Sequence, residues 1–416
     1  MKFISFRILA ATTFALMALV TSAQADYKAG ENAYLAKDYA KAFSEWAPLA
    51  NEGDPKAKYS LGNMYAAGHG VEKNNEEALK LWYKAYRQGN SDAALRIASI
   101  AIVGKNYKLA VPFLRFAAVA GNADAQFFLG SAYLLGFGIS KDTSKALLWL
   151  KLAEAGKNID ASFALGNIYR GIYDHPKDEE RSCNHYVTGV SRGEVESLAV
   201  EYMKLSADCY MSGAGVDKST SKAVKWYENA AENGSLEAQK SLGILFFTGD
   251  HVPKDISRSA KWFLKAAEQG DLISQKLIAK MYSKGDGVQK DLASAAKWFA
   301  IVADRGDIDG QVEYAMALLL GRGVEKDEAK ALGLLRKTAQ DGDMSAQLFY
   351  AGALLRGLGT DVDPVEGYKW LILAAKQGSR DAVGLMAVYG KKLTQSQLAI
   401  ASQLASEWSE NNQQSK

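Results

Sequence analysis

Small and apolar residues recur along this chain with the period of an α-helix and with a second, longer period. In residues 123–135 (ADAQFFLGSAYLL), Ala125, Leu129, Gly130 and Tyr133 fall at helical spacing. Residues 285–307 read GDGVQKDLASAAKWFAIVADRGD and residues 321–343 read GRGVEKDEAKALGLLRKTAQDGD, an offset of 36 positions. This pattern predicts amphipathic helices arranged as a repeating unit.

A glycine after each second helix marks the period. These glycines are Gly53, Gly89, Gly121, Gly156, Gly193, Gly234, Gly270, Gly306, Gly342 and Gly378. Their spacings are 36, 32, 35, 37, 41, 36, 36, 36 and 36 residues. Such a repeat indicates an array rather than separate compact domains. We therefore predict about ten repeats and a half-repeat over residues 26–390.

Each unit carries the same series of local signals. An Asp, Asn or Ser after the marker, such as Asp271, is a good N-cap for a first helix. A G-x-G-V/I loop such as residues 285–288 then ends that helix, since its glycines adopt positive φ angles easily. A second cap follows, then a helix with Ala and, three residues later, Trp, as in Ala295 and Trp298. We expect these Trp positions in the core, and stacked helix pairs that share one continuous core.

Some units depart from the pattern. Repeats one (27–53) and three (90–121) lack the glycine loop, and repeat five has His185 at the Trp position. Repeat six has five additional residues before Tyr210. After Gly378 a half-unit remains, followed by an amphipathic segment that predicts a capping helix over 391–410 and a polar tail over 411–416.

Three stretches carry a family resemblance: YAAGHGVEKNNEEALKLWYKAYRQG, YSKGDGVQKDLASAAKWFAIVADRG and WYENAAENG. They resemble Sel-one-like repeats (SLR), the longer-looped relatives of tetratricopeptide repeats, over nearly the whole mature chain. The resemblance implies an all-α fold, an α/α right-handed superhelical solenoid. It also implies a non-catalytic adaptor or scaffold for other proteins, of a kind common among exported bacterial envelope and host-interaction proteins.

The N-terminus has the features of an export signal. Lys2 and Arg7 precede an apolar run over residues 8–20, and Ala23 and Ala25 occupy the positions that a signal peptidase reads. Thirteen apolar residues are fewer than the roughly 20 that a membrane span needs. We therefore expect residues 1–25 to be removed, no membrane span, and export to the periplasm, with the extracellular space as the alternative.

The amino-acid composition indicates which class of partner the chain is expected to bind. The chain has 416 residues, 48% of them hydrophobic, with 50 basic and 47 acidic side chains. This is typical of a folded soluble protein, and the balanced charge does not favour a nucleic-acid partner. We expect a monomer that binds a protein or peptide.

Catalytic and metal-binding signatures are absent from the sequence. Of the four histidines, only His175 and His185 lie near a cysteine, Cys183, and H-x7-C-x-H is not a metal-site spacing. Sequences of the H-E-x-x-H and G-x-S-x-G types do not occur in a recognisable context, and each G-x-G follows a helix instead of a strand. We expect no cofactor and no enzyme activity. A secreted host-interaction factor and an enzyme acting on cell-wall or β-lactam amides remain the alternatives to an envelope scaffold.

Cys183 and Cys209 are the only cysteines, and export would place them where disulfides persist. In the predicted register they lie on consecutive helices, one in repeat five and one in repeat six. A bridge between these antiparallel helices is sterically reasonable, and two buried free thiols are the alternative.

The candidate partner contacts lie on the first helices, which line the concave surface in tetratricopeptide-like arrays. Positions that flank the Leu-Gly pair are often large there without being required by the repeat. The candidates are Tyr59, Phe127, Phe163, Lys240, Phe247, Lys276, Lys280, Leu319, Leu348 and Leu355. They suit a peptide or helix with apolar ends and an acidic centre. The alternative is that neighbouring repeats bury these residues.

Overall fold

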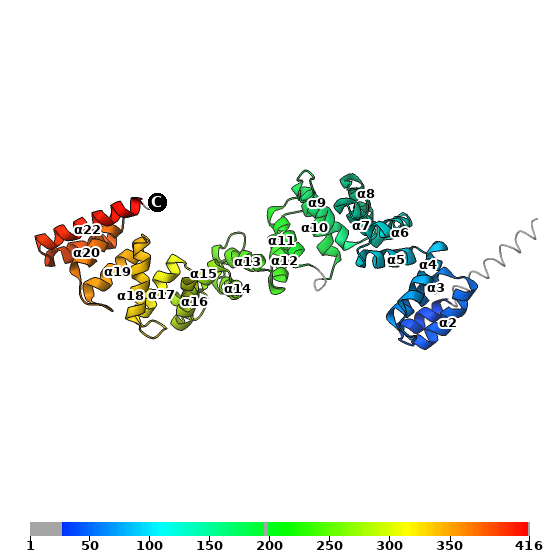
Figure 1. Ribbon diagram of the computed structural model, residues 1–416, viewed down its shortest axis with the longest axis horizontal. Helices are drawn as coiled ribbons and strands as arrows, with labels where there is room; N and C mark the ends of the chain where they lie inside the picture. Colours follow the sequence, from blue (N-terminus) through cyan, green and yellow to red (C-terminus); the bar gives the residue numbers. More distant parts are fainter. Residues whose placement is uncertain (1–26, 195–198, 415–416) are drawn as a thin grey trace, which may run out of the picture. The chain divides into compact units, whose positions relative to one another are not determined.

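The computed structural model describes residues 27–194 and 199–414, and every regular element in these ranges is a helix (Figure 1). The predicted leader, with its cleavage site between Ala25 and Asp26, lies outside the described residues. No helix in the described part of the chain has the length and apolar content needed to cross a bilayer. The chain divides into two compact units, unit 1 up to Ser219 and unit 2 from Thr220 onward.

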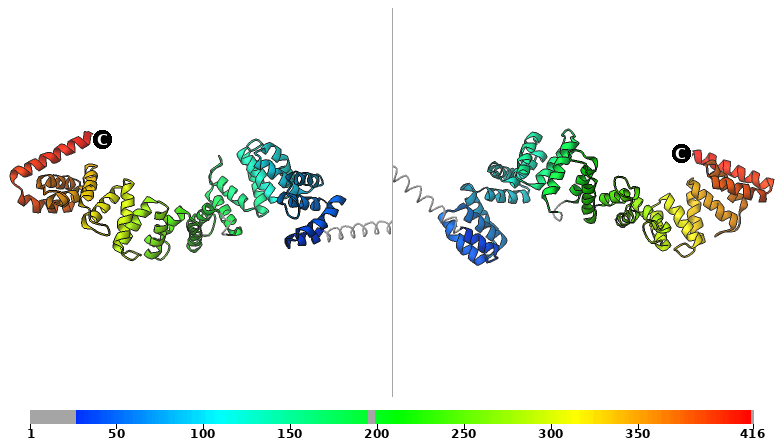
Figure 2. Two further views of the ribbon diagram at one scale, coloured as in Figure 1. Left: turned by 60° about the horizontal axis from the view of Figure 1, so that its bottom comes forward. Right: turned by 180° about the vertical axis from the view of Figure 1, so that it is seen from behind.

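Unit 1 begins with a helix over residues 27–35. The helices that follow are α2 (Tyr39–Glu52), α3 (Pro55–Ala67), α4 (Asn75–Arg87), α5 (Ser91–Val103), α6 (Tyr107–Val119), α7 (Ala123–Leu135), α8 (Thr143–Ala155), α9 (Ile159–Tyr169), α10 (Glu179–Arg192) and α11 (Val200–Ser212). Consecutive helices pack on one another (Figure 2).

Unit 2 has the same construction. Its helices are α12 (Thr220–Glu232), α13 (Leu236–Thr248), α14 (Ile256–Glu268), α15 (Leu272–Lys284), α16 (Leu292–Asp304), α17 (Ile308–Leu320), α18 (Glu328–Gln340), α19 (Met344–Arg356), α20 (Pro364–Lys376), α21 (Arg380–Tyr389), the 3₁₀ turn η2 (Gly390–Lys392) and α22 (Gln395–Gln414). From α2 to α21, odd-numbered helices are the first helices of the repeats and even-numbered helices are the second. The predicted all-α solenoid of helix pairs is confirmed.

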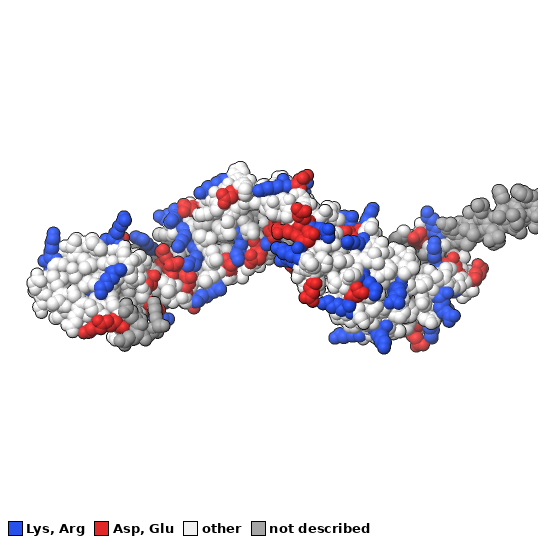
Figure 3. Space-filling view, turned by 90° about the horizontal axis from the view of Figure 1, so that it is seen from above, with Lys and Arg blue, Asp and Glu red and all other residues white. Residues whose placement is uncertain are grey.

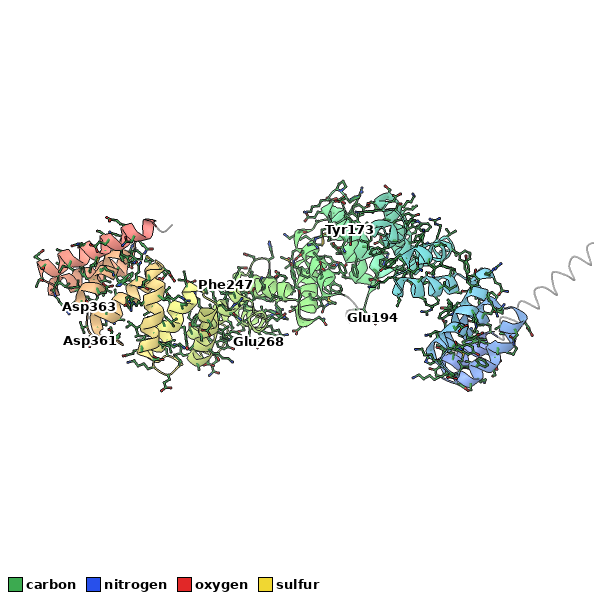
Figure 4. The ribbon with its side chains drawn as sticks, viewed as in Figure 1. Tyr173, Glu194, Phe247, Glu268, Asp361 and Asp363 are labelled. Atoms are coloured by element: carbon green, nitrogen blue, oxygen red, sulfur yellow. A yellow bond between two sulfur atoms is a disulfide. The ribbon has the colours of Figure 1, made fainter. Side chains whose placement is uncertain are left out.

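The capping residues act as the sequence predicts. The Asp271 carboxylate accepts a hydrogen bond from the Ser274 backbone N–H at 2.8 Å, at the start of α15. Asp363, labelled in Figure 4, accepts from the Glu366 backbone N–H at 2.9 Å at the start of α20. These bonds satisfy backbone donors that the first turn of a helix leaves unpaired.

The marker of repeat four is displaced by one residue. Gly156 has φ −74°, and the left-handed residue is Lys157, with φ 66°. Counted from Lys157, the spacings to Gly121 and Gly193 both become 36, so the irregular values of 35 and 37 come from the choice of marker. Helix α11 lacks the predicted cap, because Ala199 stands at its N-cap and makes no side-chain hydrogen bond.

The second glycine of each G-x-G loop lies against the second helix of the repeat before it. A Cβ on Gly287 would overlap the backbone at Ile256, and one on Gly359 would lie 2.7 Å from the Glu328 carbonyl oxygen. Both glycines also have positive φ angles, 72° and 74°. Two independent constraints therefore exclude a side chain at this position.

The glycine of the first helix fits under a large side chain of the second. A Cβ on Gly243 of α13 would lie 2.6 Å from the Phe263 ring of α14, and Trp82 of α4 covers Gly62 of α3 in the same way. These large residues stand four positions after the small residue of the second helix. The predicted Trp at the third position is in the core only in part: Trp149, Trp226 and Trp298 are half-buried, of which Trp149 and Trp298 pack against core clusters, while Trp262 is buried.

Buried glutamines join successive pairs in unit 2. Gln347 at the start of α19 donates to the Ala339 carbonyl oxygen of α18 at 3.3 Å and accepts from Gln377, which ends α20, at 2.9 Å. Gln239 and Gln275 make the same two kinds of bond, the latter with Arg305 as its donor. Each glutamine thus satisfies the end of one helix and fixes the end of another.

The last helix closes the array. Helix α22 packs on α20, with Ala401 and Ala405 fully buried and the Trp408 ring 5.6 Å from the Trp370 ring. It therefore covers α20 directly instead of pairing with α21 as the second helix of a regular repeat would. The predicted capping helix exists but runs on to Gln414, so that most of the predicted polar tail is helical.

Candidate partner-binding groove

The first helices α17, α19 and α21 line a hollow of about 590 Å³ in unit 2. Leu319 and Leu320 of α17, Leu348 of α19 and Leu385 and Val388 of α21 supply apolar lining. A hollow lined by apolar side chains from three successive helices can hold the side chains of a bound peptide or helix. The C-terminal end of unit 2 also shows few charged side chains on the face seen in Figure 3.

Two glycines inside helices open this hollow. Gly352 of α19 and Gly384 of α21 have no atom within 4 Å of the position where a Cβ would stand, so packing does not require them to be glycine. A glycine inside a helix costs about 1 kcal/mol relative to alanine. Other repeats carry Ile244, Lys280 and Met316 at the position of Gly352. These two glycines are functional candidates that the repeat pattern did not single out, although the substitution at this position is visible in the sequence.

The rim of the hollow is charged. Arg356 of α19 and both Arg380 and Asp381 of α21 line it, and all three are exposed. The groove therefore combines an apolar floor with two cationic groups and one anionic group at its edge.

Unit 1 has a smaller hollow between α6 and α7. It measures about 260 Å³ and is lined by Phe127, Phe128 and Leu135 of α7 and by Val111 and Leu114 of α6. Phe127 is half-buried there, whereas Phe128 and Leu135 are exposed. The predicted contact Phe127 thus belongs to an apolar depression.

Three of the ten predicted contacts are almost fully buried. Phe163, Leu319 and Leu355 are only 4%, 4% and 7% exposed. The Tyr202 ring stacks on Phe163 with 4.0 Å between centroids, and Leu355 fills the space left by Gly367 of α20. For Phe163 and Leu355 the alternative of burial between neighbouring helices is therefore correct, while Leu319 forms part of the groove floor.

The predicted lysine centre is largely neutralised within the chain. Lys240 pairs with Asp271 at 3.4 Å, and Lys276 pairs with Asp307 at 3.0 Å and Asp309 at 2.8 Å. Partial burial lowers the pKa of Lys276, but its two aspartate partners outweigh that effect and the pKa is raised. These bonds join first helices of successive repeats, so an acidic centre in the partner is no longer favoured.

The remaining candidates are accessible to different degrees. Tyr59, Lys280 and Leu348 are half-buried, and Phe247 on α13, labelled in Figure 4, is exposed with Lys254 5.6 Å from its ring centroid. Leu348 is the one that lies in the groove of unit 2.

The two cysteines meet at the junction of repeats five and six. Cys183 of α10 and Cys209 of α11 are joined in the structure, with their Cα atoms 5.4 Å apart. Beside them the Tyr186 hydroxyl donates to the side-chain oxygen Oδ1 of Asn167 at 2.8 Å, and the side-chain amide of Asn167 donates to the Tyr202 hydroxyl at 3.1 Å. The disulfide stays a prediction that thiol titration can test.

The histidines do not form a metal site. His185 donates to the Glu154 carboxylate at 2.8 Å and stacks on Tyr169, while Nδ1 of His175 lies 2.9 Å from the Pro176 carbonyl oxygen. Within the described ranges, no group of three or more His, Cys, Asp or Glu side chains is placed to hold a metal ion.

The comparisons with known proteins agree with the architecture. The family model described as the Sel1 repeat matches residues 55–90, 123–158, 159–193, 185–209, 202–235, 236–271, 273–307, 308–343 and 345–379. These ranges pass over most of repeats one and three, the two units without a glycine loop.

Solved structures include similar chains. A protective antigen of uropathogenic Escherichia coli with an SLR fold is 25% identical, with 96% of this chain and 94% of that chain covered and a TM-score of 0.61. A Sel1 repeat protein from Oxalobacter formigenes is 27% identical, with 76% and 90% covered and a TM-score of 0.48.

One curated relative is an exopolysaccharide production negative regulator of Rhizobium meliloti (strain 1021). It is 26% identical over 138 residues, which are 29% of this chain and 52% of the relative. The chain thus spans about half the length of that protein.

Proposed function

The chain belongs to the Sel1 repeat family, and we propose that it is a non-catalytic interaction scaffold of the bacterial envelope that binds a partner protein through the groove of α17, α19 and α21. Sel1 repeats generally mediate protein interactions, and the fold is typically non-enzymatic. The groove is the observation that carries the proposal. An apolar depression that a soluble chain leaves uncovered is typical of an interface.

The form of the groove favours a particular kind of partner. Gly352 and Gly384 leave room between Leu348 and Val388 for a large apolar side chain. Arg356 and Arg380 at the rim favour a carboxylate close to that side chain, since a charged group there pairs without being fully desolvated. The partner is therefore a segment with a bulky apolar anchor and a neighbouring acidic group.

The envelope location rests on the leader-like residues 1–25, and the expected mature chain begins at Asp26. N-terminal sequencing of the exported protein tests it directly. A chain in the cytoplasm that still carries Met1 would contradict the proposed location and leave the groove proposal intact.

Filling the groove tests the binding site. Gly352→Leu places a side chain in the hollow and replaces glycine by a better helix former, so the fold is expected to be kept or slightly stabilised. Crosslinking and affinity capture from the periplasm should recover the partner with the natural chain and lose it with this variant. The melting temperature of the variant should equal or exceed that of the natural chain.

The matched control is Gly333→Leu on α18. Gly333 is also inside a helix with no atom within 4 Å of its Cβ position, but it lies outside the groove lining. We expect this variant to capture the partner normally. Equal capture by both variants would show that the partner binds elsewhere.

A secreted factor that engages a host is the second candidate. It is favoured by the similarity to a chain described as a protective antigen of a uropathogen. Fractionation of cells and medium separates the two, because the scaffold should stay with the cells. Incubation with labelled β-lactam tests the enzyme alternative, and covalent labelling would overturn the non-catalytic proposal.

A further inference from the structure

The outer faces of the two units differ in their apolar content. Large exposed apolar side chains occur on the second helices α4, α6 and α8 of unit 1: Leu79, Tyr83, Leu109, Val119, Leu148 and Leu152. The second helices of unit 2 from α12 to α20 carry none among their described residues. The difference is local, because α2 and α10 carry none either.

Three of these side chains, Leu79, Tyr83 and Leu109, border a shallow apolar hollow between α4, α5 and α6. It measures about 470 Å³, and Leu79, Tyr83, Ile100, Leu109 and Phe113 line it. Helices α4 and α6 are in direct contact beneath it, since the Tyr86 ring lies 5.0 Å from the Phe113 ring. One helical turn beyond Ile100, Val103 ends α5 with 84% of its side chain exposed.

The same surface is basic. From the start of α4 to Leu109 the chain has six basic side chains and three acidic: Lys80, Lys84, Arg87, Arg96, Lys105 and Lys108 against Glu76, Glu77 and Asp92. Lys80 pairs with Glu76 at 2.9 Å. Within the described residues no ion pair engages Lys84, Lys105 or Lys108. The balanced charge of the whole chain conceals this local excess.

We infer that this surface, formed by α4, the end of α5 and the start of α6, docks on an anionic lipid membrane. Exposed Val103, Leu109 and Tyr83 would enter the boundary between head groups and acyl chains, and the lysines beside them would pair with lipid phosphates. Apolar side chains interspersed with Lys and Arg are the pattern that binds such an interface. The inference does not depend on the groove, which lies in unit 2.

The exposed end of α5 and start of α6, here called the apolar tip and carrying Val103 and Leu109, favours a membrane over a peptide partner. Val103 projects from a turn that holds Lys105 at φ 56°, and Lys108 and Leu109 follow in the first turn of α6. A short peptide would occupy the hollow and leave this tip in water. A lipid surface contacts both at once.

Vesicle sedimentation tests the inference with the chain that begins at Asp26, so that the apolar leader takes no part. Binding to phosphatidylglycerol vesicles should exceed binding to phosphatidylcholine vesicles at least tenfold and should weaken in high salt. Lys105→Glu/Lys108→Glu should reduce it at least tenfold, and Val103→Ser/Leu109→Ser several-fold. Melting temperatures should stay close to that of the natural chain, because all four residues are exposed.

Matched controls lie in unit 2. Lys290→Glu/Lys297→Glu makes the same change in net charge, and Ile273→Ser/Ile308→Ser removes two exposed apolar side chains. Both should bind within about twofold of the natural chain. Absence of binding to anionic vesicles, or equal loss in controls and variants, overturns the inference. If vesicles do not bind and a captured acidic protein is lost from the Lys105→Glu/Lys108→Glu variant, the surface is a protein interface instead.

Discussion

Successive repeats are held together differently in two regions of the chain. We use the word joint for the contacts between one repeat and the next, and compare the joints of unit 2 with the joint between repeats five and six in unit 1. In unit 2, Gln239, Gln275 and Gln347 bridge one helix end to the next with hydrogen bonds of the same kind. At the joint of repeats five and six, Ala199 provides no side-chain cap to α11. There Cys183 and Cys209 join α10 to α11, and a chain of Tyr186, Asn167 and Tyr202 runs beside them.

The difference shows how an array tolerates an irregular unit. Each regular joint has glutamine hydrogen bonds of the same kind as the neighbouring joints. Loss of the bonds at one regular joint therefore leaves the equivalent bonds at the other joints in place. The irregular joint interrupts that series and relies on bonds that occur once. Its failure should therefore affect stability more than the failure of a regular joint.

Removal of the disulfide should have the largest effect. For Cys183→Ala/Cys209→Ala, the sequence separation of 26 residues predicts a loss of about 3 kcal/mol in the free energy of unfolding of unit 1. Urea unfolding without reductant measures it, and the natural chain with dithiothreitol should approach the variant. Two titratable thiols in the denatured, non-reduced chain would show that the bridge is absent.

Loss of one regular joint should have a smaller effect. Gln347→Ala leaves the Ala339 carbonyl oxygen without its buried partner, while the exposed Gln377 amide keeps its bond to the Gly342 carbonyl oxygen, so the loss should be about 2 kcal/mol. Urea unfolding of the variant, monitored beside the exposed control Gln289→Ala, measures the difference. A loss equal to that of the disulfide variant would contradict the contrast between the two kinds of joint.

The smallest effect should come from the ion pair beside the irregular joint. Burial raises the pKa of Glu154, but the hydrogen bond from His185 and its charge outweigh burial, and the pKa stands below its usual value. A lowered carboxyl pKa stabilises the fold above the unfolded value of about 4.3, and the contribution is lost as the pH falls through the folded pKa.

Glu154→Gln should therefore reduce stability by about 1 kcal/mol or less near pH 7, and the difference should diminish between pH 7 and about pH 3. Denaturant unfolding between these two pH values measures it. Glu268→Gln, at an exposed position labelled in Figure 4, is the control and should show no such pH dependence. A difference that persists at the acidic end would assign the loss to packing.

The sequence predicted the repeating parts of the fold because they arise from local chemistry. Caps such as Asp271 and loops such as residues 285–288 depend on neighbours within four residues, and both are where the pattern places them. The position of the large buried residue in the second helix was harder to predict. Trp298 and Phe299 are adjacent in the sequence, and only the packing of the helix pair shows that Phe299 is buried.

The groove was predicted less well because its residues are defined by contacts between repeats. Leu348 lies in it, but Leu355 faces Gly367 of the next helix, which a pattern of single helices does not reveal. Lys276 looked like a binding site for an acidic partner until Asp307 and Asp309, about 30 residues later, were found to neutralise it. The basic outer face was missed because net charge was counted over the whole chain.

The contact between the second glycine of a G-x-G loop and the backbone of the preceding repeat has a consequence for how a chain of this kind changes in length. Gly70, Gly138, Gly287, Gly323 and Gly359 meet the backbone of Tyr39, Tyr107, Ile256, Leu292 and Glu328. Four residue types (Tyr, Ile, Leu and Glu) stand at the five contacts, and each of these pairs is 31 residues apart; Gly215 of the irregular repeat six meets the backbone of Glu180 instead, 35 residues before it. A loop glycine can therefore pack on the backbone of the preceding repeat whatever side chain that repeat carries at the contact. Duplication or deletion in frame of a 36-residue segment among the regular repeats leaves these glycine–backbone contacts intact. A gene of this kind can therefore gain or lose binding modules without changing the contacts between repeats.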